Sequence, residues 1–586
     1  MLFNTLTYAK FFAVVFVISW LLVRRRWALL LPWVALAGYA SFSGAPSYHT
    51  VGVPALALAL TLSLVRTVPA DGIPTARTSG AALLVNAIAL CWITLTRPDA
   101  DILKRALGEL GDGSTGLILY LLTVGLAAGV LYALTRARKV RLLFVLGASY
   151  VFYAHWDWRF LPLIWGSSTA DWLLGNAIAR SQDPRRRRWW LAGTVALNLG
   201  VLGIFKYFNF GIESASAALS ALGMRPPEVA LRIALPIGVS FFTFESMSYV
   251  IDIYRKQLEP QKSYAEYLSF VAFFPHLVAG PIVRPRDLLP QLAGPARWSS
   301  AEASEGLFLI AVGLLKKVAI GDYLALGLVD RVFDAPVQYS SLECYVAVLG
   351  YAVQIYCDFS GYTDIAIGSA LLLGVRFPLN FNAPYKAHNM VEFWRRWHIS
   401  LSTWLRDYLY IPLGGNRRGP ARTYANLMIT MLLGGLWHGA SWTFVVWGGI
   451  HGTALAVSRA LIDRRTAAGG PAVPSGARRV AGVVLTFHVV CAAWVFFRAG
   501  TFQGAWVFFA QLSQGTAHYA NLNVPVLTVL GIGLASHWMP ESWYLRLRGQ
   551  FIALPAAAQA LLLLGVAYTL DRMASAEAVP FVYFQF

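Results

Sequence analysis

Long apolar runs, separated by short polar or basic turns, recur along the whole chain. A membrane span needs about 20 predominantly apolar residues, and by this criterion the sequence predicts roughly 13 to 16 membrane-embedded segments, some of them re-entrant. The predicted segments are residues 11–23, 27–42, 51–65, 81–94, 117–134, 142–153, 161–179, 189–205, 233–253, 307–326, 345–373, 427–436, 443–461, 480–497, 526–537 and 551–570.

The composition agrees with this pattern. Hydrophobic residues make up 57% of the 586 residues and charged residues only 13%, against about 25% charged in soluble proteins. We therefore expect an all-α, polytopic membrane protein. No long polar stretch remains for a soluble domain, so any chemistry must take place in or at the bilayer.

The net charge of +19 comes from 48 Lys and Arg residues against 29 Asp and Glu residues. In a soluble protein such an excess would suggest nucleic acid, but here the positive-inside rule explains it better. We expect no nucleic-acid partner and place the basic turns in the cytoplasm and the N-terminus outside it. The first apolar segment lacks a clear cleavage site and is interpreted as a retained span. The basic clusters are residues 24–26, 136–139, 185–188, 255–256, 464–465, 478–479 and 546–548.

Two polar segments suggest how the chain is organised. Residues 97–114 mix acids, bases and glycines and form the best candidate connection between an accessory N-terminal bundle, residues 1–115, and a main body, residues 116–586. Residues 462–476 are rich in Ala, Gly and Pro and are interpreted as a cytoplasmic linker. The four cysteines are scattered and suggest neither a disulfide framework nor a zinc site.

The most informative motif is WHGASW at residues 437–442, because it places His438 between two apolar runs. We expect this imidazole at a turn or break within the membrane, where ionisable groups are expensive and point to function. Two structural alternatives stand beside catalysis: an imidazole satisfied by a backbone carbonyl, or a close helix contact through Gly439 and Gly448.

The densest basic region covers residues 376–422, where eight Lys and Arg residues accompany only two acids. Few of its apolar residues are consecutive, so amphipathic helices at the interface fit better than a spanning helix. On one helix His398 and Ser402 would share a stripe, with Arg395 to Trp397 in the turn before it. Cationic and aromatic side chains suit a ligand with phosphates and an adenine ring, but also suit anchoring at the membrane surface. Both roles can hold at once.

Polar residues also interrupt two other apolar runs. Asp358 and Asp364 must pair internally or line a wet cavity, and we expect Asp358 to pair with an arginine of the basic region such as Arg395. His276 precedes a Gly-Pro helix break and is either a third active-site group or a helix cap. The sequence contains no Gly-x-Ser-x-Gly elbow, Walker loop, His-Glu-x-x-His or other metal constellation, which argues against common hydrolase, nucleotidase and metalloprotease mechanisms.

These motifs together resemble the membrane-bound O-acyltransferase family, especially its bacterial branch of alginate O-acetylases and teichoic acid D-alanyl transfer proteins. The resemblance covers roughly residues 117–586 and leaves the N-terminal bundle without a counterpart. The matching segments are FKYFNF at 205–210, LPIGVSFFTF at 235–244, FPHLVAGPI at 274–282, YCDFSGYTD at 356–364, residues 394–410, GGNR at 414–417, WHG at 437–439 and FVYFQF at 581–586.

The resemblance implies a ring of tilted transmembrane and re-entrant helices around a thin centre, with a tunnel from a cytoplasmic donor site to an extracytoplasmic acceptor site. The family's nearly invariant histidine corresponds to His438, and the second histidine of the bacterial branch corresponds to His398. We expect His438 to act as general base or transient acyl acceptor, and His398 to position the thioester or polarise its carbonyl. The predicted substrate-binding residues are Arg395, Arg396, Trp397, Ser402, Arg406, Asp358, Asn416 and Trp437.

The expected reaction moves an acyl group, most simply acetyl, from acetyl-CoA or another thioester, including an acyl carrier, to a hydroxyl outside the cytoplasm. No bound cofactor is expected. The acceptor is a polysaccharide such as alginate, another exopolysaccharide or peptidoglycan, or an extracytoplasmic partner resembling an acyltransferase or esterase, and the location is the bacterial inner membrane. The alternatives are D-alanyl transfer to teichoic acid, a transporter or flippase without acyl chemistry, and a scaffold for an envelope-modifying complex.

Overall fold

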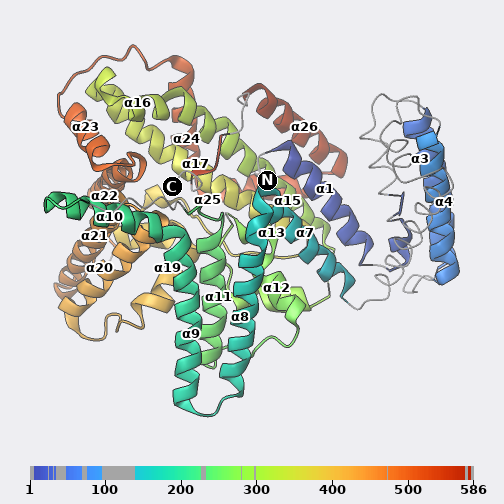
Figure 1. The fold of residues 1–586 in the computed structure, drawn as a ribbon. Coiled ribbons are helices and arrows are strands. Elements are labelled where there is room, and N and C mark those ends of the chain that lie inside the picture. The colour runs from blue at the N-terminus through green and yellow to red at the C-terminus, as the bar shows by residue number, and fades with distance from the viewer. Residues whose placement is uncertain are drawn as a thin grey trace. The chain divides into compact units, whose positions relative to one another are not determined.

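The computed structural model describes residues 5–23, 25–30, 32–33, 48–68, 75–95, 139–225, 233–278, 280–295, 298–471, 473–573 and 579–582. The chain forms two compact units, Lys10–Ala148 and a larger unit made of Met1–Ala9 and Ser149–Phe586 (Figure 1). The described residues form helices and contain no strand. The predicted connection at 97–114, the predicted segment at 117–134 and the last four residues lie outside the described parts.

The smaller unit contains a pair of apolar helices, α3 and α4. Leu29, Val65 and Ala82 belong to its buried apolar cluster, and the buried Asn86 side chain donates to Thr61 Oγ1 at 3.0 Å. The described elements are most of α1 (Leu6–Leu21), η1 (Arg25–Leu30), α3 (Tyr48–Arg66), α4 (Ala76–Leu95) and the start of α7 (Val140–Asp157). The boundary predicted at residue 115 stays a prediction.

The larger unit holds the remaining elements. Its first half comprises η2 (Trp158–Phe160), α8 (Leu161–Arg180), α9 (Pro184–Leu202), η3 (Gly203–Tyr207), α10 (Phe208–Ala221), α11 (Val239–Tyr254), α12 (Tyr264–Ala272), α13 (Phe274–Leu277), α14 (Pro285–Ala293), α15 (Ser300–Leu314), η4 (Leu315–Asp322), η5 (Ala325–Val329), α16 (Asp330–Asp334) and η6 (Pro336–Gln338). Its second half comprises α17 (Ser341–Leu372), η7 (Pro384–Lys386), α18 (Met390–Arg396), α19 (Ile399–Leu405), η8 (Arg406–Tyr410), α20 (Gly419–His438), α21 (Trp442–Ala467), α22 (Gly476–Arg498), α23 (Phe502–Leu512), α24 (Val524–Trp538), α25 (Glu541–Ala553) and α26 (Ala556–Met573).

The 32-residue helix α17 is the buried element of this unit. A capping box between Ser340 and Glu343 fixes its start, and most of its residues are buried. Its backbone approaches α15 so closely that a Cβ on Gly361 would lie 2.7 Å from the Gly313 carbonyl oxygen. Small residues at such a contact let two helices pack backbone to backbone, as membrane proteins require.

Among the described residues, three helical stretches are long and apolar enough to cross a membrane, namely Pro184–Ala221, Trp442–Ala467 and Gly476–Arg498. The predicted segments 161–179, 443–461 and 480–497 fall within single helices, 189–205 passes from α9 into η3, and 345–373 ends one residue beyond α17. Their apolar composition was sufficient to locate them. The short helices α12, α13, α14 and α23 had no predicted counterpart.

The basic region is more broken than the sequence pattern suggested. Helix α18 ends at Arg396, Trp397 is extended, and His398 adopts the left-handed conformation with φ 41° before α19 starts. The Ile399 N–H at this break donates to the Asn380 carbonyl at 2.9 Å. The prediction that His398 and Ser402 lie on one helical stripe that follows directly from Arg395 was therefore wrong.

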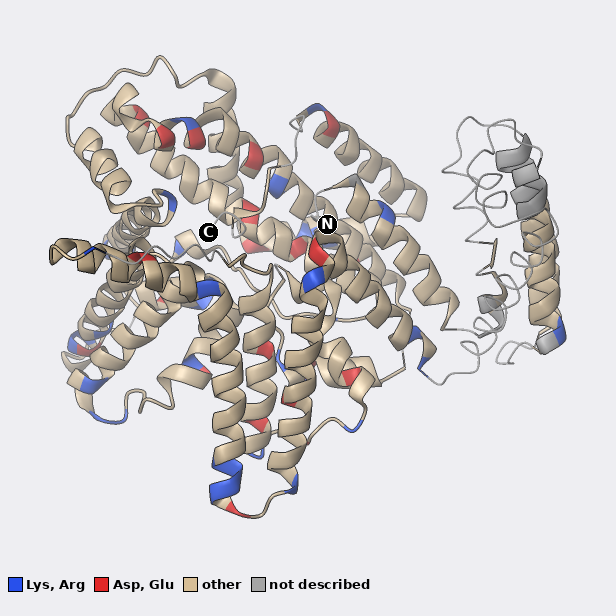
Figure 2. Cartoon of the chain, in the orientation of Figure 1, with Lys and Arg blue, Asp and Glu red and all other residues tan. Residues whose placement is uncertain are grey.

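Basic side chains gather at particular helix ends of the larger unit. Figure 2 shows Lys and Arg at the tip of the α8–α9 hairpin and at the lower end of the α20–α21 pair. The α9 start carries Arg185 to Arg188, and the last turn of α21 carries Arg464 and Arg465. Arg187 donates to the Tyr254 carbonyl at 2.8 Å, which ties this basic tip to the end of α11.

Candidate active site

His438 is the last residue of α20 and lies in an aromatic box. Its side chain is buried, with ring centroids 5.1 Å from Trp437, 5.0 Å from Trp447 and 5.6 Å from Phe497. The backbone then turns through Gly439, and α21 begins at Trp442. The predicted turn or break at this histidine is confirmed.

His398 is buried beside a polar cluster. Its Nδ1 lies 3.2 Å from Asn380 Oδ1, and the same oxygen accepts hydrogen bonds from the Ser400 hydroxyl at 2.8 Å and the Ser400 N–H at 3.1 Å. Since a carbonyl oxygen can only accept, Nδ1 must carry the hydrogen in the neutral ring. That tautomer, inferred from the hydrogen-bond network, leaves Nε2 with a lone pair, and Nε2 has no hydrogen-bond partner in the described part of the chain.

The two imidazoles lie on the same tryptophan. The His398 ring centroid is 6.2 Å from Trp437, and Phe359 packs edge-on against His398 at 4.7 Å. The left-handed backbone of His398 is unusual for a residue other than glycine, and such strain persists where the surrounding structure enforces it, often at functional sites. The arrangement therefore provides two buried imidazoles separated by one indole.

A series of packed aromatic rings leads away from this pair. Trp437 stacks on Phe244 at 5.3 Å, Phe244 stacks on Trp404 at 3.7 Å, and Trp404 contacts Tyr408 at 5.0 Å. The Trp404 indole N–H donates to the Phe244 carbonyl at 2.9 Å, which fixes that stack. The rings belong to one buried apolar cluster with Phe241, and the series ends at a strongly basic cavity.

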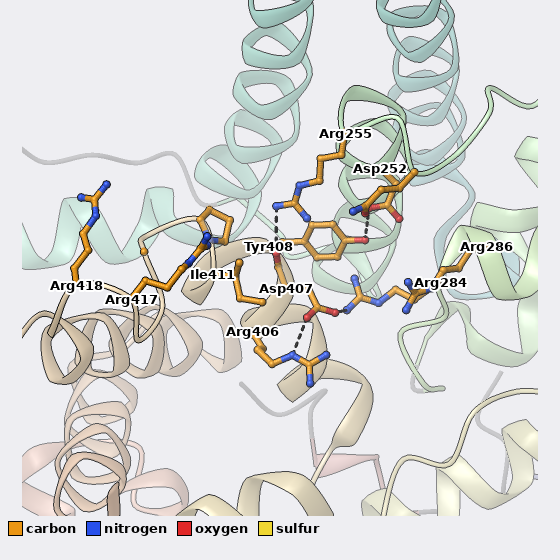
Figure 3. A pocket seen from close by; sticks show the side chains of 13 residues that line it. Asp252, Arg255, Arg284, Arg286, Arg406, Asp407, Tyr408, Ile411, Arg417 and Arg418 are labelled. Carbon is orange, nitrogen blue, oxygen red and sulfur yellow. Dashed lines mark hydrogen bonds and ion pairs between the residues drawn. The ribbon is translucent and has the colours of Figure 1, made fainter. Parts of the chain in front are cut away.

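That cavity has a volume of about 740 Å³ and is lined by six arginines but only two carboxylates (Figure 3). Its walls come from the end of α11, the segment that leads into α14, and the region from η8 to the start of α20. Guanidinium groups bind phosphate oxygens bidentately, so the cavity suits a ligand that carries several phosphates. The lining residues are Asp252, Arg255, Gln257, Arg284, Arg286, Arg406, Asp407, Tyr408, Ile411, Pro412, Gly414, Arg417 and Arg418.

Tyr408 and Asp407 organise the floor of the arginine cavity. The Tyr408 hydroxyl donates to Asp252 at 2.9 Å, and the Arg255 and Arg284 guanidiniums lie 5.2 and 4.5 Å from its ring centroid (Figure 3). Asp407 accepts hydrogen bonds from Arg284 at 3.3 Å and from Arg406 at 2.7 Å. Burial lowers the pKa of Arg284, while neighbouring Tyr408 and Asp407 raise it. An arginine in this setting keeps its charge at neutral pH.

Only one of the predicted substrate-binding residues lines the arginine cavity. Arg406 lines it, and the exposed Asn416 lies between lining residues of the same loop without lining the cavity itself. Arg395 is exposed and does not line it, and Arg396 instead pairs with Glu392 at 2.9 Å.

The remaining predicted binding residues lie elsewhere. Trp397 is fully buried against Trp494 at 5.1 Å, Ser402 is partly buried on α19, and Trp437 separates the two histidines. Trp397 and Ser402 do not line the arginine cavity, and their substrate-binding roles stay predictions.

Asp358 has a different partner from the one expected. Its Oδ1 lies 2.5 Å from Lys317 Nζ, and Lys317 also contacts Asp322 at 2.5 Å, whereas Asp364 pairs with Lys316 at 2.7 Å. The expected pairing of Asp358 with an arginine of the basic region was wrong, because the adjacent π-helix η4 supplies two lysines to α17. Asp358 Oδ2 accepts the Val582 N–H at 2.9 Å, so this carboxylate also holds the C-terminal segment.

His276 contacts protein groups on both sides of its ring. Its Nδ1 is 3.0 Å from Glu245 Oε1 and its Nε2 is 3.0 Å from the Phe270 carbonyl. Both contacts are fully buried, which favours a structural role over a third active-site group. Among the described residues no group of three His, Cys, Asp or Glu side chains is arranged to hold a metal ion.

Sequence reasoning missed Asn380, Ser400, Arg255, Arg284 and Tyr408. Ser400 and Tyr408 lie inside the recognised 394–410 segment, and Arg284 comes two residues after the 274–282 motif, so their proximity in sequence was a usable signal. Asn380 offered none, because only the left-handed break at residue 398 brings it to the imidazole.

Comparison with known proteins identifies the family of this chain. The model of the membrane-bound O-acyltransferase family matches residues 240–497, which include both histidines and all residues that line the arginine cavity. The probable alginate O-acetylase of Azotobacter vinelandii is 45% identical over 408 residues, covering 69% of this chain and 78% of that protein.

More distant relatives carry names that specify other activities. The peptidoglycan O-acetyltransferase of Helicobacter pylori is 37% identical over 61% of this chain and 71% of its own length. The teichoic acid D-alanyltransferase of Bacillus subtilis is 26% identical over 45% of this chain and 69% of its own length. The chain thus belongs to the membrane-bound O-acyltransferase family and is an O-acyltransferase.

Proposed function

We propose that this O-acyltransferase moves an acetyl group from a cytoplasmic thioester, most simply acetyl-CoA, to a hydroxyl on the other side of the membrane. The observation that carries the proposal is the pair of buried imidazoles on Trp437, joined by packed rings to an arginine-lined cavity. The cavity provides for the donor's phosphates and the imidazoles provide for proton transfer. His438 and His398 are the proposed catalytic residues.

The positions of basic residues support this direction of transfer. The arginine cavity adjoins the end of α11 through Arg255, and the Arg187 contact ties that end to the basic tip of α9. By the positive-inside rule this end of the protein lies in the cytoplasm. We therefore propose that the donor enters from the cytoplasm of a bacterial cell and, from the charge pattern of the sequence, that the N-terminus lies outside it.

The chemistry needs one base and one site for the departing thiol. His438 takes the proton of the acceptor hydroxyl, the hydroxyl oxygen bonds to the thioester carbonyl carbon, and the carbon–sulfur bond breaks. The thiolate leaves with a proton from the imidazolium. A transient acyl group on His438 would lead to the same products. In the tautomer set by Asn380, His398 Nε2 has no hydrogen to give to a carbonyl oxygen, which favours a proton-accepting role over the polarising role.

The acceptor is proposed from the relatives. Those with the higher identities have names that specify alginate or peptidoglycan, both of which present hydroxyl groups, so we propose a polysaccharide hydroxyl or the hydroxyl of an extracytoplasmic partner that passes the acetyl group on. D-alanyl transfer is the weaker alternative, since that relative matches less than half of this chain.

The test is transfer of radiolabelled acetyl from acetyl-CoA in membranes that contain the wild-type protein or His438→Ala, together with a candidate acceptor or partner. Release of free CoA is followed in parallel. We expect label transfer with wild type and none with folded His438→Ala, while His488→Ala, on the exposed His488 of α22, keeps full activity. Wild-type activity in His438→Ala would remove this residue from the reaction. Solute transport without donor consumption would instead support a transporter.

A further inference from the structure

The end of the helix that carries His438 is capped by side chains from a different part of the chain. The last four carbonyl groups of any α-helix lack partners within the helix and must find them elsewhere. In α20 all four carbonyl groups are satisfied, three of them by two consecutive residues of η3. The Gly435 carbonyl accepts from the Gly439 N–H at 3.4 Å, and the Leu436 carbonyl accepts from the Tyr207 hydroxyl at 2.9 Å. The Trp437 and His438 carbonyls both accept from the Lys206 ammonium, which lies 3.2 Å from the His438 oxygen.

The Lys206 ammonium has a third acceptor in the Ser240 hydroxyl of α11 at 3.3 Å. It also lies 5.9 Å from the Trp437 ring centroid. A cation at a helix C-terminus interacts favourably with the negative end of the helix dipole. One side chain therefore links η3, α11 and the last turn of α20.

The local backbone at Lys206 is also unusual. The stretch Gly203–Tyr207 is a π-helical turn between α9 and α10, and such turns inside α-helices are rare and are frequently found at functional sites. Lys206, Ser240 and His438 line one small cavity of about 150 Å³. An ionisable group placed among apolar helices is costly and calls for a functional explanation.

We propose that Lys206 is a positioning residue for acyl transfer. By holding the Trp437 and His438 carbonyls, it fixes the turn that carries the imidazole and so sets where His438 lies relative to the thioester and the acceptor hydroxyl. This inference rests on the proposed role of His438. Lys206 does not line the arginine cavity, so it acts on turnover and leaves the donor's binding unchanged.

The first test compares Lys206→Met with wild type in the acetyl-transfer assay, with kcat and the KM for acetyl-CoA measured separately. A charge-assisted hydrogen bond contributes about 1.5–3 kcal/mol, so we expect kcat to fall by about tenfold to a hundredfold. The donor's KM should stay within about twofold, the pattern of a lost interaction that matters for turnover alone. Tyr207→Phe, which removes a neutral hydrogen bond one carbonyl earlier, should cost less than about tenfold.

A second measurement separates positioning from general folding. In Lys206→Ala the missing atoms correspond to propylammonium, so adding this cation should restore part of the turnover, whereas neutral propanol should not. If Lys206→Met does not fold, Lys206→Gln, which keeps a donor without the charge, replaces it under the same criteria. Folded Met or Gln variants with wild-type kcat, or no rescue by propylammonium, would overturn the proposal.

The His438→Ala control separates a failure of the positioning role of Lys206 from a failure of the proposed role of His438. If His438→Ala loses transfer and Lys206→Met does not, only the positioning role fails. If His438→Ala keeps transfer, the proposed role of that histidine fails first.

Discussion

The buried ion cluster around Lys317 allows a quantitative prediction of stability. Lys317 Nζ lies 2.5 Å from both Asp322 and Asp358, and the lysine side chain is only 1% exposed. Lys317→Met would leave two adjacent buried carboxylates without a cation. Removing one partner of a buried ion pair costs about 3–5 kcal/mol, mostly because the remaining charge is uncompensated. At about 2.1 cal/mol/K of unfolding entropy per residue, 586 residues give a total unfolding entropy of ~1.2 kcal/mol/K. Dividing the lost free energy by this entropy predicts that Lys317→Met lowers the melting temperature by about 2–4 °C.

The cluster has one cation for two acids, so removing the cation and removing one acid should lower the melting temperature by different amounts. Asp358→Asn leaves the Lys317–Asp322 pair balanced and should lower the melting temperature less than Lys317→Met does. The matched control is Arg459→Met, since Arg459 pairs with Asp463 at 3.0 Å on the surface with both side chains about half exposed. Such exposed pairs contribute at most about 1 kcal/mol, so this control should melt within about 1 °C of wild type.

The assay is thermal unfolding of the detergent-solubilised, full-length protein, followed by tryptophan fluorescence and size-exclusion chromatography at one fixed scan rate, because unfolding of a protein of this size is often irreversible. The predicted stabilisation by the ion cluster is refuted if Lys317→Met melts at the same temperature as the Arg459→Met control. It is equally refuted if Asp358→Asn is as damaging as Lys317→Met.

Two further predictions concern the helix contact and the donor site. A Cβ on Gly448 would lie 2.4 Å from the Met431 carbonyl oxygen, so Gly448→Ala should separate α20 from α21, destabilise the protein by about 1–3 kcal/mol and lower acetyl transfer. The control Gly449→Ala, whose Cβ would meet its nearest neighbour at 3.8 Å, should have none of these effects. Equal melting curves for the two variants would contradict this prediction. Arg284→Gln should raise the KM for acetyl-CoA by about tenfold or more without changing the melting temperature by much, since it removes a cation from the arginine cavity. The KM difference should shrink at high salt, and a KM equal to wild type in initial-rate measurements would exclude Arg284 from donor binding.

The sequence predicted several of the long helices from apolar composition alone. The predicted segment 345–373 lies in one buried helix, α17, up to Leu372, although two aspartates interrupt the apolar run, because the lysines of η4 neutralise them. The smaller elements of the basic region could not be predicted in the same way. There a left-handed residue at His398 divides the stretch into two seven-residue helices, and hydrogen bonds to Asn380 hold the break.

The sequence predicted the position of His438 better than it predicted the residues of the arginine cavity. His438 stood out because its motif is short and surrounded by apolar residues, and the structure places it at the predicted turn. The arginine cavity was assigned too narrowly to residues of one segment. It is assembled from three segments that are distant in sequence, so Arg255 and Arg284 meet Arg406 only in the folded chain.

Catalytic and structural interpretations of the WHGASW motif are compatible, because separate contacts hold the same helix end. Near this end Gly435 lets the Phe444 backbone of α21 approach α20 closely, and Lys206 and Tyr207 of η3 cap the final carbonyls. A helix end normally frays, since its last carbonyls lack partners. Here contacts from two directions hold it, and the residue held at that end is His438. A close glycine contact would suffice for packing alone, but a lysine placed on the carbonyls of this one turn is costly in an apolar setting. That cost is understandable if the position of the imidazole matters for the reaction.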